Sequence, residues 1–469
     1  MAVKKITLLK KTAGHINLDG YSGAAKSEIT GGNTESNIDV VKNGSGDITD
    51  ITYQGYQFKG TRGNATVDGT DVYGGRSKAG NTTTDNDVTV ASGSHTNAYG
   101  GWTSGEGTTA ADKNNSYKNK VTVKGSATVS GKVYGGYTDV AGGTATGNTV
   151  TVEKDLGADL VGGKAAAEAS DNTVTVGNAT VKSITGGDGA TTKGNTVNIN
   201  NTTVTNKIVG GTAANNDADK ANTLNVKGQN SAQSVEGFQK MNFNTNGVAA
   251  NGTMLTLNGG AESKVDWNTL TVNGNGSGIT LLKNDAGINL ANYTDGAVKS
   301  GLSTDRKSEI NVSVVKNAVT QKYTDIKYSG NQFMGVESAD IQGTKVYGGI
   351  SKAGNATHNN RITVNGSYTE VYGGHTTGTS DTAVEKKNSH DNTVTITGGT
   401  LGKVYGGYTD VDGGTTENNT VNLGDGTNAL AAGTDLSNAE FYGGNKSAKG
   451  NTLNVNTAAT VGKIENFST

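Results

Sequence analysis

Histidine supplies acid–base chemistry near neutral pH more often than any other residue, and this sequence of 469 residues has only five. None of them recurs at a repeated position beside a serine or an aspartate, so no nucleophile–base arrangement is indicated. The five are His15, His95, His358, His375 and His390. We therefore expect solvated loop histidines and no catalytic residue.

Paired carboxylates are the other arrangement that could do chemistry, because polysaccharide-cleaving sites use two of them. The best candidates are Asp410 and Asp412 in "YTDVDGG". The matching segment "YTDVAGG" has Asp139 but Ala141 in the second place. Since only one acid is kept in both segments, a catalytic pair is disfavoured, and we expect these acids in solvated turns.

The sequence lacks the motifs that usually bind metals or cofactors. The chain has no cysteine, which excludes disulfides and thiolate zinc sites. Its Gly-Gly pairs do not form the G-x-G-x-x-G pattern that opens a helix at a phosphate. A calcium-type segment, "GGDGATTKG" (186–194), occurs only once, and a formal net charge of −2 gives no reason to expect nucleic acid. We expect no cofactor, no metal and no nucleic-acid partner.

The sequence does contain a repeat built from two alternating motifs. One is N-x-V-x-V, as in "GNTVTV" (147–152) and "DNTVTI" (391–396). The other is an apolar residue, a residue that is often tyrosine, and Gly-Gly, as in "VYGG" (72–75). Successive Gly-Gly pairs are separated by 24 to 37 residues, mostly 24 to 27. A period of this length predicts a stacked repeat architecture.

Strict alternation of apolar and polar residues predicts strands with one buried face. Only 32% of residues are hydrophobic, too few for several ordinary cores but enough for the thin core of a stacked repeat. Proline is absent, as expected for a chain of mostly central strands. The sequence predicts an all-β, single-stranded parallel β-helix, or β-solenoid, with about 24–35 residues per coil.

An asparagine opens each N-T-V or N-T-L motif and occupies a fixed place at a turn. Equivalent asparagines on stacked coils can hydrogen-bond to one another through their amide side chains. A simpler alternative is that each asparagine only favours the turn. The regular spacing favours a ladder, whose predicted members are Asn148, Asn172, Asn195, Asn222, Asn392, Asn419 and Asn451.

Aromatic residues give a candidate binding surface. The second position of the x-Y-G-G motif varies among Tyr, Val and Thr, which indicates that it faces outward, and tyrosines on successive coils would then stack. Such a stripe is either purely structural or a platform for sugars or another rod. Two longer loops, 102–119 and 375–392, are predicted to project. The candidate residues are Tyr73, Tyr99, Tyr134, Tyr347, Tyr372, Tyr405, Tyr442, Trp102 and His375.

The chain also contains a longer internal duplication. "ITLLKKTAGHINL" (6–18) matches "ITLLKNDAGINL" (279–290), and further pairs of segments follow in the same order. The sequence predicts a first β-solenoid block at 1–244 and connecting β coils at 245–278. A second block at 279–469 is a slightly shorter tandem copy of the first.

Several segments together resemble the passenger domains of bacterial type V autotransporters. They are "EGFQKMNF" (236–243), "GTMLTLNGGAESKVDWNTLTV" (252–272) and "ITLLK" (279–283), with the "VYGG…GNTVTV" coils. The resemblance covers nearly the whole chain and implies a right-handed β-helix that acts as a surface adhesin. The opening "MAVKKITLLKKTAG" does not match a signal peptide, so a signal and a membrane barrel or anchor are expected outside the sequence given.

We therefore expect an extracellular adhesin-type β-solenoid, displayed on the bacterial cell surface, that is not an enzyme and mediates attachment or self-association. Its partner would be a host or bacterial surface glycan or protein, or another copy of itself. Two alternatives stay open. A carbohydrate-active β-helix enzyme would need acids grouped on neighbouring coils. A purely structural rod or fibre protein would need no ligand.

Overall fold

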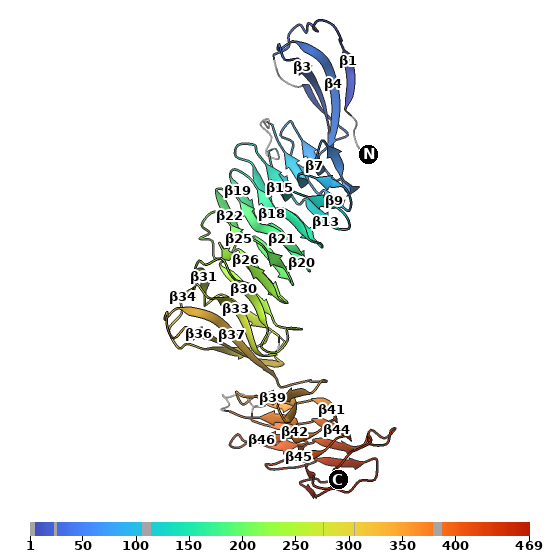
Figure 1. Ribbon diagram of the computed structural model, residues 1–469, viewed down its shortest axis with the longest axis vertical. Helices are drawn as coiled ribbons and strands as arrows, with labels where there is room; N and C mark the ends of the chain where they lie inside the picture. Colours follow the sequence, from blue (N-terminus) through green and yellow to red (C-terminus); the bar gives the residue numbers. More distant parts are fainter. Residues whose placement is uncertain (1–4, 23–25, 106–113, 275, 304, 379–386) are drawn as a thin grey trace.

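The chain is all-β, as predicted. The computed structural model describes residues 5–22, 26–105, 114–274, 276–303, 305–378 and 387–469. No α-helix occurs among them, and accordingly none of these residues forms a helix long and apolar enough to cross a membrane. Most strands lie in long parallel sheets, and the molecule is elongated, with strand β1 (Ile6–Lys10) towards one end and the C-terminus near the other (Figure 1).

The N-x-V-x-V motifs of the first half lie in a parallel sheet of nine strands. Equivalent residues pair across repeats, so that Val121 lies between Val88 and Val150. Because side chains alternate between the faces of a strand, the valines point inward and the threonines outward. The strands are β5 (Arg62–Asn64), β9 (Asp87–Val90), β13 (Lys120–Val123), β17 (Thr149–Val152), β20 (Thr173–Gly177), β23 (Thr196–Asn200), β26 (Thr223–Lys227), β29 (Lys240–Asn244) and β32 (Leu270–Asn273).

The Gly-Gly motifs of the first half lie in a second sheet, of fifteen strands. These are β6 (Thr66–Asp68), β7 (Asp71–Ser77), β11 (Ala98–Thr103), β15 (Lys132–Thr138), β18 (Leu156–Lys164), β21 (Thr180–Asp188), β24 (Thr203–Val204), β25 (Lys207–Gly211), β27 (Asn230–Ala232), β28 (Ser234–Glu236), β30 (Thr253–Leu257), β33 (Gly276–Asn284), β35 (Lys299–Leu302), β36 (Ser308–Lys316) and β37 (Tyr323–Gln332).

Shorter parallel sheets complete the first half. A sheet of five strands contains β8 (Thr83–Thr84), β12 (Ser116–Tyr117), β16 (Thr144–Thr146), β19 (Glu168–Ser170) and β22 (Thr191–Lys193). Two strand pairs are β10 (Ser94–His95) with β14 (Thr128–Val129), and β31 (Ser263–Asp266) with β34 (Ile288–Ala291). We call the parallel strands from β5 to β34 the first stack. The predicted connecting segment contributes strands to this stack.

The second half repeats the same three kinds of sheet, and we call its parallel strands from β39 to β51 the second stack. The Gly-Gly sheet contains β38 (Asp340–Gln342), β39 (Lys345–Ser351), β42 (Tyr368–Thr376), β45 (Leu401–Tyr405), β46 (Tyr408–Thr409), β49 (Glu440–Tyr442) and β51 (Lys463–Glu465). The others are β40 (Thr357–His358), β43 (Ser389–His390) and β47 (Thr416–Glu417), and β41 (Arg361–Asn365), β44 (Thr393–Gly398), β48 (Thr420–Leu423) and β50 (Thr452–Val455).

Each half opens with antiparallel strands, which the sequence did not predict. The first antiparallel sheet has the order β1-β4-β3-β2. Its strands are β1 (Ile6–Lys10), β2 (Lys26–Thr30), β3 (Thr34–Lys42) and β4 (Ile48–Gln57). The second antiparallel sheet consists of β33, β37, β36 and β35, and Figure 1 places it between the two stacks.

A buried glutamate joins each antiparallel sheet to the stack that follows it. Glu35 is fully buried and accepts hydrogen bonds from Ser77 Oγ at 2.6 Å and Asn81 Nδ2 at 2.9 Å. Glu309 makes the equivalent contact with Asn355 Nδ2 at 2.8 Å, and with the hydroxyl of Ser351. Charge-assisted hydrogen bonds of this kind are stronger than neutral ones, so these glutamates fix the two parts together.

Each stack encloses a thin apolar core. Val121 and Val150 are fully buried, and the core of the first stack continues into Tyr328 of the second antiparallel sheet. The second stack has a separate core that includes Val394 and Phe441. The two stacks are therefore packed as separate units along the chain.

Asparagine side chains form two hydrogen-bonded ladders. In the first, Nδ2 of each asparagine donates to Oδ1 of the next, for example Asn148 to Asn172 at 3.1 Å and Asn172 to Asn195 at 3.0 Å. Asn172 Nδ2 also donates to the backbone oxygen of Ala145 at 3.0 Å. The members are Asn86, Asn119, Asn148, Asn172, Asn195 and Asn222 in the first stack and Asn360, Asn392, Asn419 and Asn451 in the second.

The Gly-Gly pairs make room for these ladders. A Cβ atom on Gly163 would clash with the amide of Asn172, and one on Gly162 would clash with the backbone oxygen of Gly186. Gly162 and Gly163 lie inside strand β18, and neither has a positive φ. Positive φ instead occurs one residue before a ladder asparagine, as at Asp171.

Replacing Asn172 by alanine should destabilise the first stack by about 3 kcal/mol. The change removes the hydrogen bonds that Asn172 Nδ2 donates to the backbone oxygen of Ala145 and to Asn195 Oδ1. It also removes the hydrogen bond from Asn148 Nδ2 to Asn172 Oδ1, and the loss of a buried partner costs about 1–3 kcal/mol. Urea denaturation followed by circular dichroism measures the effect. The control is Asn198→Ala, which removes an asparagine from a partly exposed position on the outer face. Equal losses for the two variants would contradict the account of the ladder.

Candidate binding surfaces

The predicted tyrosines of the first half stack along the sheet. The rings of Tyr73 and Tyr99 are 5.1 Å apart, and those of Tyr99 and Tyr134 are also 5.1 Å apart, with interplanar angles of 8° and 9°. In-register pairing of β7, β11 and β15 places these residues side by side. Trp102 stacks on Tyr73 and Tyr99 at 5.4 Å.

These tyrosines lie outside the valine core and stack on one another, but a second layer of side chains covers them. Tyr73, Tyr99 and Tyr134 are 3%, 8% and 7% exposed. The side chains at the position three residues later, including Trp102 and Tyr137, pack against them as a second layer. Burial raises the pKa of Tyr134 to about 12 and keeps its phenol neutral. The rings therefore form a small satellite core in the first stack.

Arg76 adds a cation to this cluster. Its guanidinium lies 4.4 Å from the ring centre of Tyr73 and 4.7 Å from that of Trp102, and it pairs with the carboxylate of Asp68. A guanidinium over aromatic rings is attracted by their π electrons, so Arg76 closes the end of the aromatic stack.

The second half has the equivalent cluster. Tyr347, Tyr372, Tyr405 and Tyr442 stack at successive distances of 5.2, 5.3 and 4.9 Å. Tyr347 and Tyr372 are buried, whereas Tyr405 and Tyr442 remain partly exposed. His375 takes the place that Trp102 has in the first half, and its ring lies 4.6 Å from that of Tyr372.

His375 is held neutral by its surroundings. Burial lowers its pKa to about 4, and this effect outweighs the opposing attraction of Asp410. Neither ring nitrogen has a hydrogen-bond partner among the described residues. The imidazole is therefore neutral near pH 7 and packs as an aromatic ring against Tyr372.

The structure describes the ends of the two predicted projecting loops and the two predicted acids. Residues 106–113 and 379–386, the central parts of the two loops, lie outside the described residues. Asp410 and Asp412 are exposed in the turn that follows β46. Among the residues that the structure describes, no group of three or more histidine or acidic side chains could hold a metal ion.

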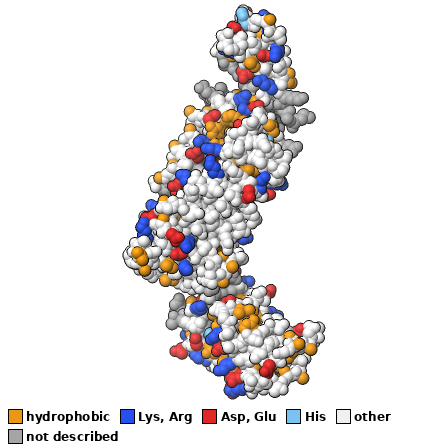
Figure 2. Space-filling model, viewed as in Figure 1, with side chains coloured by type: hydrophobic (Ala, Val, Ile, Leu, Met, Phe, Trp, Pro, Cys, Tyr) orange, Lys and Arg blue, Asp and Glu red, His pale blue; other side chains and the backbone are white. Residues whose placement is uncertain are grey.

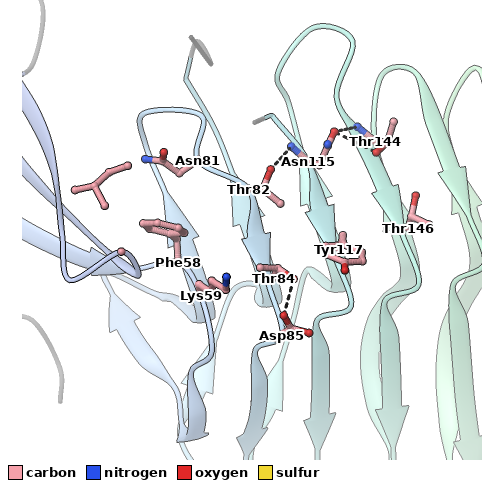
Figure 3. A pocket seen from close by; sticks show the side chains of 12 residues that line it. Phe58, Lys59, Asn81, Thr82, Thr84, Asp85, Asn115, Tyr117, Thr144 and Thr146 are labelled. Atoms are coloured by element: carbon pink, nitrogen blue, oxygen red, sulfur yellow. Dashed lines mark hydrogen bonds between the residues drawn. The ribbon is translucent and has the colours of Figure 1, made fainter. Parts of the chain in front are cut away.

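A groove beside the first stack was not predicted. It lies where the first antiparallel sheet meets the stack and has a volume of about 630 Å³ (Figure 3). Hydroxyl and amide groups provide most of its lining, with two aromatic rings and one residue of each charge. The lining residues are Ile29, Gly32, Phe58, Lys59, Asn81, Thr82, Thr84, Asp85, Asn115, Tyr117, Thr144 and Thr146.

The in-register sheet of β8, β12 and β16 positions the groove residues. Thr84, Tyr117 and Thr146 pair across these strands and form one row. Asn115 Oδ1 accepts hydrogen bonds from the backbone nitrogen and the hydroxyl of Thr144 at 3.0 and 3.1 Å, as Figure 3 shows. Tyr117 is 36% exposed, and the ammonium group of Lys118 lies 4.9 Å from its ring. A ligand could therefore reach a fixed ring flanked by polar groups.

The same row has different chemistry in the second stack. His358, His390 and Glu417 pair across β40, β43 and β47, at the positions that Thr84, Tyr117 and Thr146 occupy in the first stack. The two imidazole rings stack at 5.0 Å. The sequence could have indicated this row, because its residues differ between the two halves at matching positions. The groove itself could not be located in this way, because the antiparallel sheet that forms its other side was not predicted.

Uncharged polar surface dominates the middle of the first stack in Figure 2, while hydrophobic side chains gather in patches on both stacks.

No protein-family model matches the chain, and no curated protein and no solved structure matches it either.

Replacing His375 by tryptophan, the residue at the matching position of the first half, should reduce the loss of folding stability at acidic pH. Because the folded pKa of about 4 is below the ordinary value of 6.5, the unfolded chain takes up this proton first as the pH falls. Burial of the neutral His375 imidazole therefore contributes its full stabilisation above pH 6.5. This stabilisation, at most about 3 kcal/mol, is lost as the pH falls towards 4.

Chemical denaturation of the two proteins at a series of pH values between 7 and 4 tests this prediction. Carboxylate titrations are common to both proteins and cancel in the difference between them. The difference in unfolding free energy should change steadily below pH 6.5. Parallel curves over the whole range would show that His375 is freely protonated in the folded chain.

Proposed function

We propose that this chain is an extracellular adhesin-type β-solenoid, displayed on a bacterial cell surface, that mediates attachment or self-association without catalysing a reaction. The groove beside the first stack is the observation that carries the proposal. It combines a fixed concave shape with hydroxyl and amide groups that both donate and accept hydrogen bonds. Such a lining suits a polar, hydroxyl-rich ligand such as a surface glycan.

The solenoid part of this proposal is a right-handed, single-stranded parallel β-helix. Its support is that successive repeats each add strands to the same parallel sheets, with equivalent residues in register. The asparagine ladders repeat at the same interval. A stack of this kind holds lateral residues at fixed spacing, which is suitable for presenting a binding surface.

The proposed cellular setting follows from the resemblance to type V autotransporter passenger domains. Passenger domains of this kind are adhesin-like, and an uncharged polar lateral face is compatible with contact to another surface. The partner of the groove would be a host or bacterial surface glycan or protein.

Tyr117→Ala should lower the affinity for a surface glycan about tenfold, because it removes the exposed ring from the centre of the row. The measurement is binding of the labelled full chain to arrayed host and bacterial glycans and to immobilised matrix proteins. Tyr117→Phe, which keeps the ring, should retain most of the affinity.

The matched control is His390→Ala, at the equivalent position of the second stack, which should leave binding unchanged. Equal losses for Tyr117→Ala and His390→Ala would place the binding surface elsewhere. Failure of the unchanged chain to bind any glycan or matrix protein would contradict attachment and favour a structural rod.

A further inference from the structure

The row of residues in the groove begins with a lysine. Lys59 forms a parallel bridge with Thr84, so it extends the row that contains Tyr117 towards the first antiparallel sheet (Figure 3). In the second stack, Met334 forms the equivalent bridge with His358. The register therefore matches each residue of the first row with one residue of the second row.

The turn that follows each row carries opposite charges in the two stacks. Lys118 follows Tyr117, and its ammonium group lies 4.9 Å from the centre of that ring. Asp391 follows His390, and its carboxylate lies 2.7 Å from the imidazole Nδ1. Lys118 and Asp391 have φ values of 53° and 55°, so the two turns have the same backbone form. A cation in one half thus corresponds to an anion in the other.

Arg62 and Glu337 are a further matched pair of opposite charge. The residue before each of them donates its backbone N–H to the first ladder asparagine of its stack at 2.9 Å, which establishes the match. The guanidinium of Arg62 donates to the backbone oxygen of Asp85, a groove residue. Arg62 therefore lies beside the turn that carries the carboxylate of Asp85 and offsets its charge.

The first groove is cationic as a result, and the equivalent surface of the second stack is anionic. Asp85 is the one carboxylate among the lining residues of the groove. Glu417 takes the place of Thr146 in the second row. The cations around the first row are Lys59, Arg62 and Lys118. The residues at the same positions of the second stack are Met334, Glu337 and Asp391.

The three cations are accessible to a ligand. Lys59, Arg62 and Lys118 are all exposed, and no ion pair joins any of them to another described residue. The neighbouring hydroxyl of Tyr117 raises the pKa of Lys118, which keeps this ammonium group charged at neutral pH. A concave surface with an excess of one charge attracts ligands of the opposite charge.

We propose that the groove beside the first stack binds an acidic glycan, whose carboxylate or sulfate groups pair with Lys59, Arg62 and Lys118. A sugar ring packs on Tyr117, and the hydroxyl and amide groups of the lining bind sugar hydroxyls. The second stack repels the same ligand, because Glu337 and Asp391 replace two of the cations. This inference rests on the proposed function, since it names the class of ligand for the same groove.

Titration calorimetry of the full chain with three oligosaccharides of equal length tests the proposal. Hyaluronan carries carboxylates only, keratan sulfate carries sulfates only, and the chitin oligosaccharide is uncharged. At least one acidic oligosaccharide should bind, and the neutral one should bind at least about tenfold more weakly. Binding of hyaluronan alone assigns carboxylates to the ligand, and binding of keratan sulfate alone assigns sulfates. Raising the salt concentration from about 0.05 to about 0.5 M should weaken acidic binding, because exposed charges are screened.

Three results would overturn the proposal. One is that neither acidic oligosaccharide binds. Another is that the chitin oligosaccharide binds as tightly as the acidic ones at both salt concentrations. The third is that polyglutamate of the same charge binds equally well, since the groove would then accept any polyanion, acidic proteins included.

A variant that exchanges residues between the halves locates the site. Lys59→Met with Lys118→Asp introduces the residues of the second stack and should weaken acidic binding at least about tenfold. Aspartate adopts a positive φ more readily than most residues, so the turn should keep its form. The matched control, Lys264→Met with Lys327→Asp, makes the same change of charge at exposed positions of β31 and β37 and should bind normally. Equal losses for the two variants would place the ligand elsewhere and contradict the proposal.

These measurements separate failure of this inference from failure of the proposed function. Binding of the neutral oligosaccharide that depends on Tyr117 but not on salt would leave attachment through the groove intact and exclude an acidic ligand. Absence of binding to every glycan and matrix protein would remove both.

Discussion

In-register pairing of equivalent residues on successive repeats is the constraint on which the structure depends. It places valine beside valine in the core and asparagine beside asparagine in the ladders. The ladder amides fill the space above the second glycine of each Gly-Gly pair, so a side chain at Gly163 is excluded by Asn172. Core, ladder and glycine motif are therefore consequences of one register.

The same constraint allows the lateral surfaces to differ between halves without altering the scaffold. Position by position, Trp102 is replaced by His375, and Tyr117 by His390, while the valines and asparagines inside keep their roles. Aromatic residues that follow the Gly-Gly motif become satellite cores because the register brings each ring within about 5 Å of the next. Unlike these satellite cores, the groove does not form from the stack alone. It also depends on the first antiparallel sheet, which Glu35 holds beside the row that contains Tyr117.

Much of the architecture could be predicted from local pattern. Alternating residues indicate strands, a period near 25 residues indicates stacking, and the spacing of Asn148 and Asn172 led to the ladder. The N-T-V form of the motif missed Asn86, Asn119 and Asn360, because a residue other than threonine follows each of them. The antiparallel strands pair across short turns, as between Thr30 and Thr34, and these hairpins were missed. The groove could not be predicted, because the buried contact of Glu35 that holds the antiparallel sheet against the stack joins residues more than 40 positions apart. The covering of the tyrosines was missed because it depends on side chains in a second layer.

The most direct test of the account measures distances between successive repeats. The chain has no cysteine, so spin labels can be attached to introduced pairs: Thr122→Cys with Thr151→Cys, and Thr122→Cys with Thr175→Cys. The first pair occupies facing positions on neighbouring strands, and the second is separated by one further strand. With strands about 4.8 Å apart, the account predicts much stronger dipolar broadening for the first pair than for the second. Equal broadening, or none in the first pair, would contradict the in-register stack.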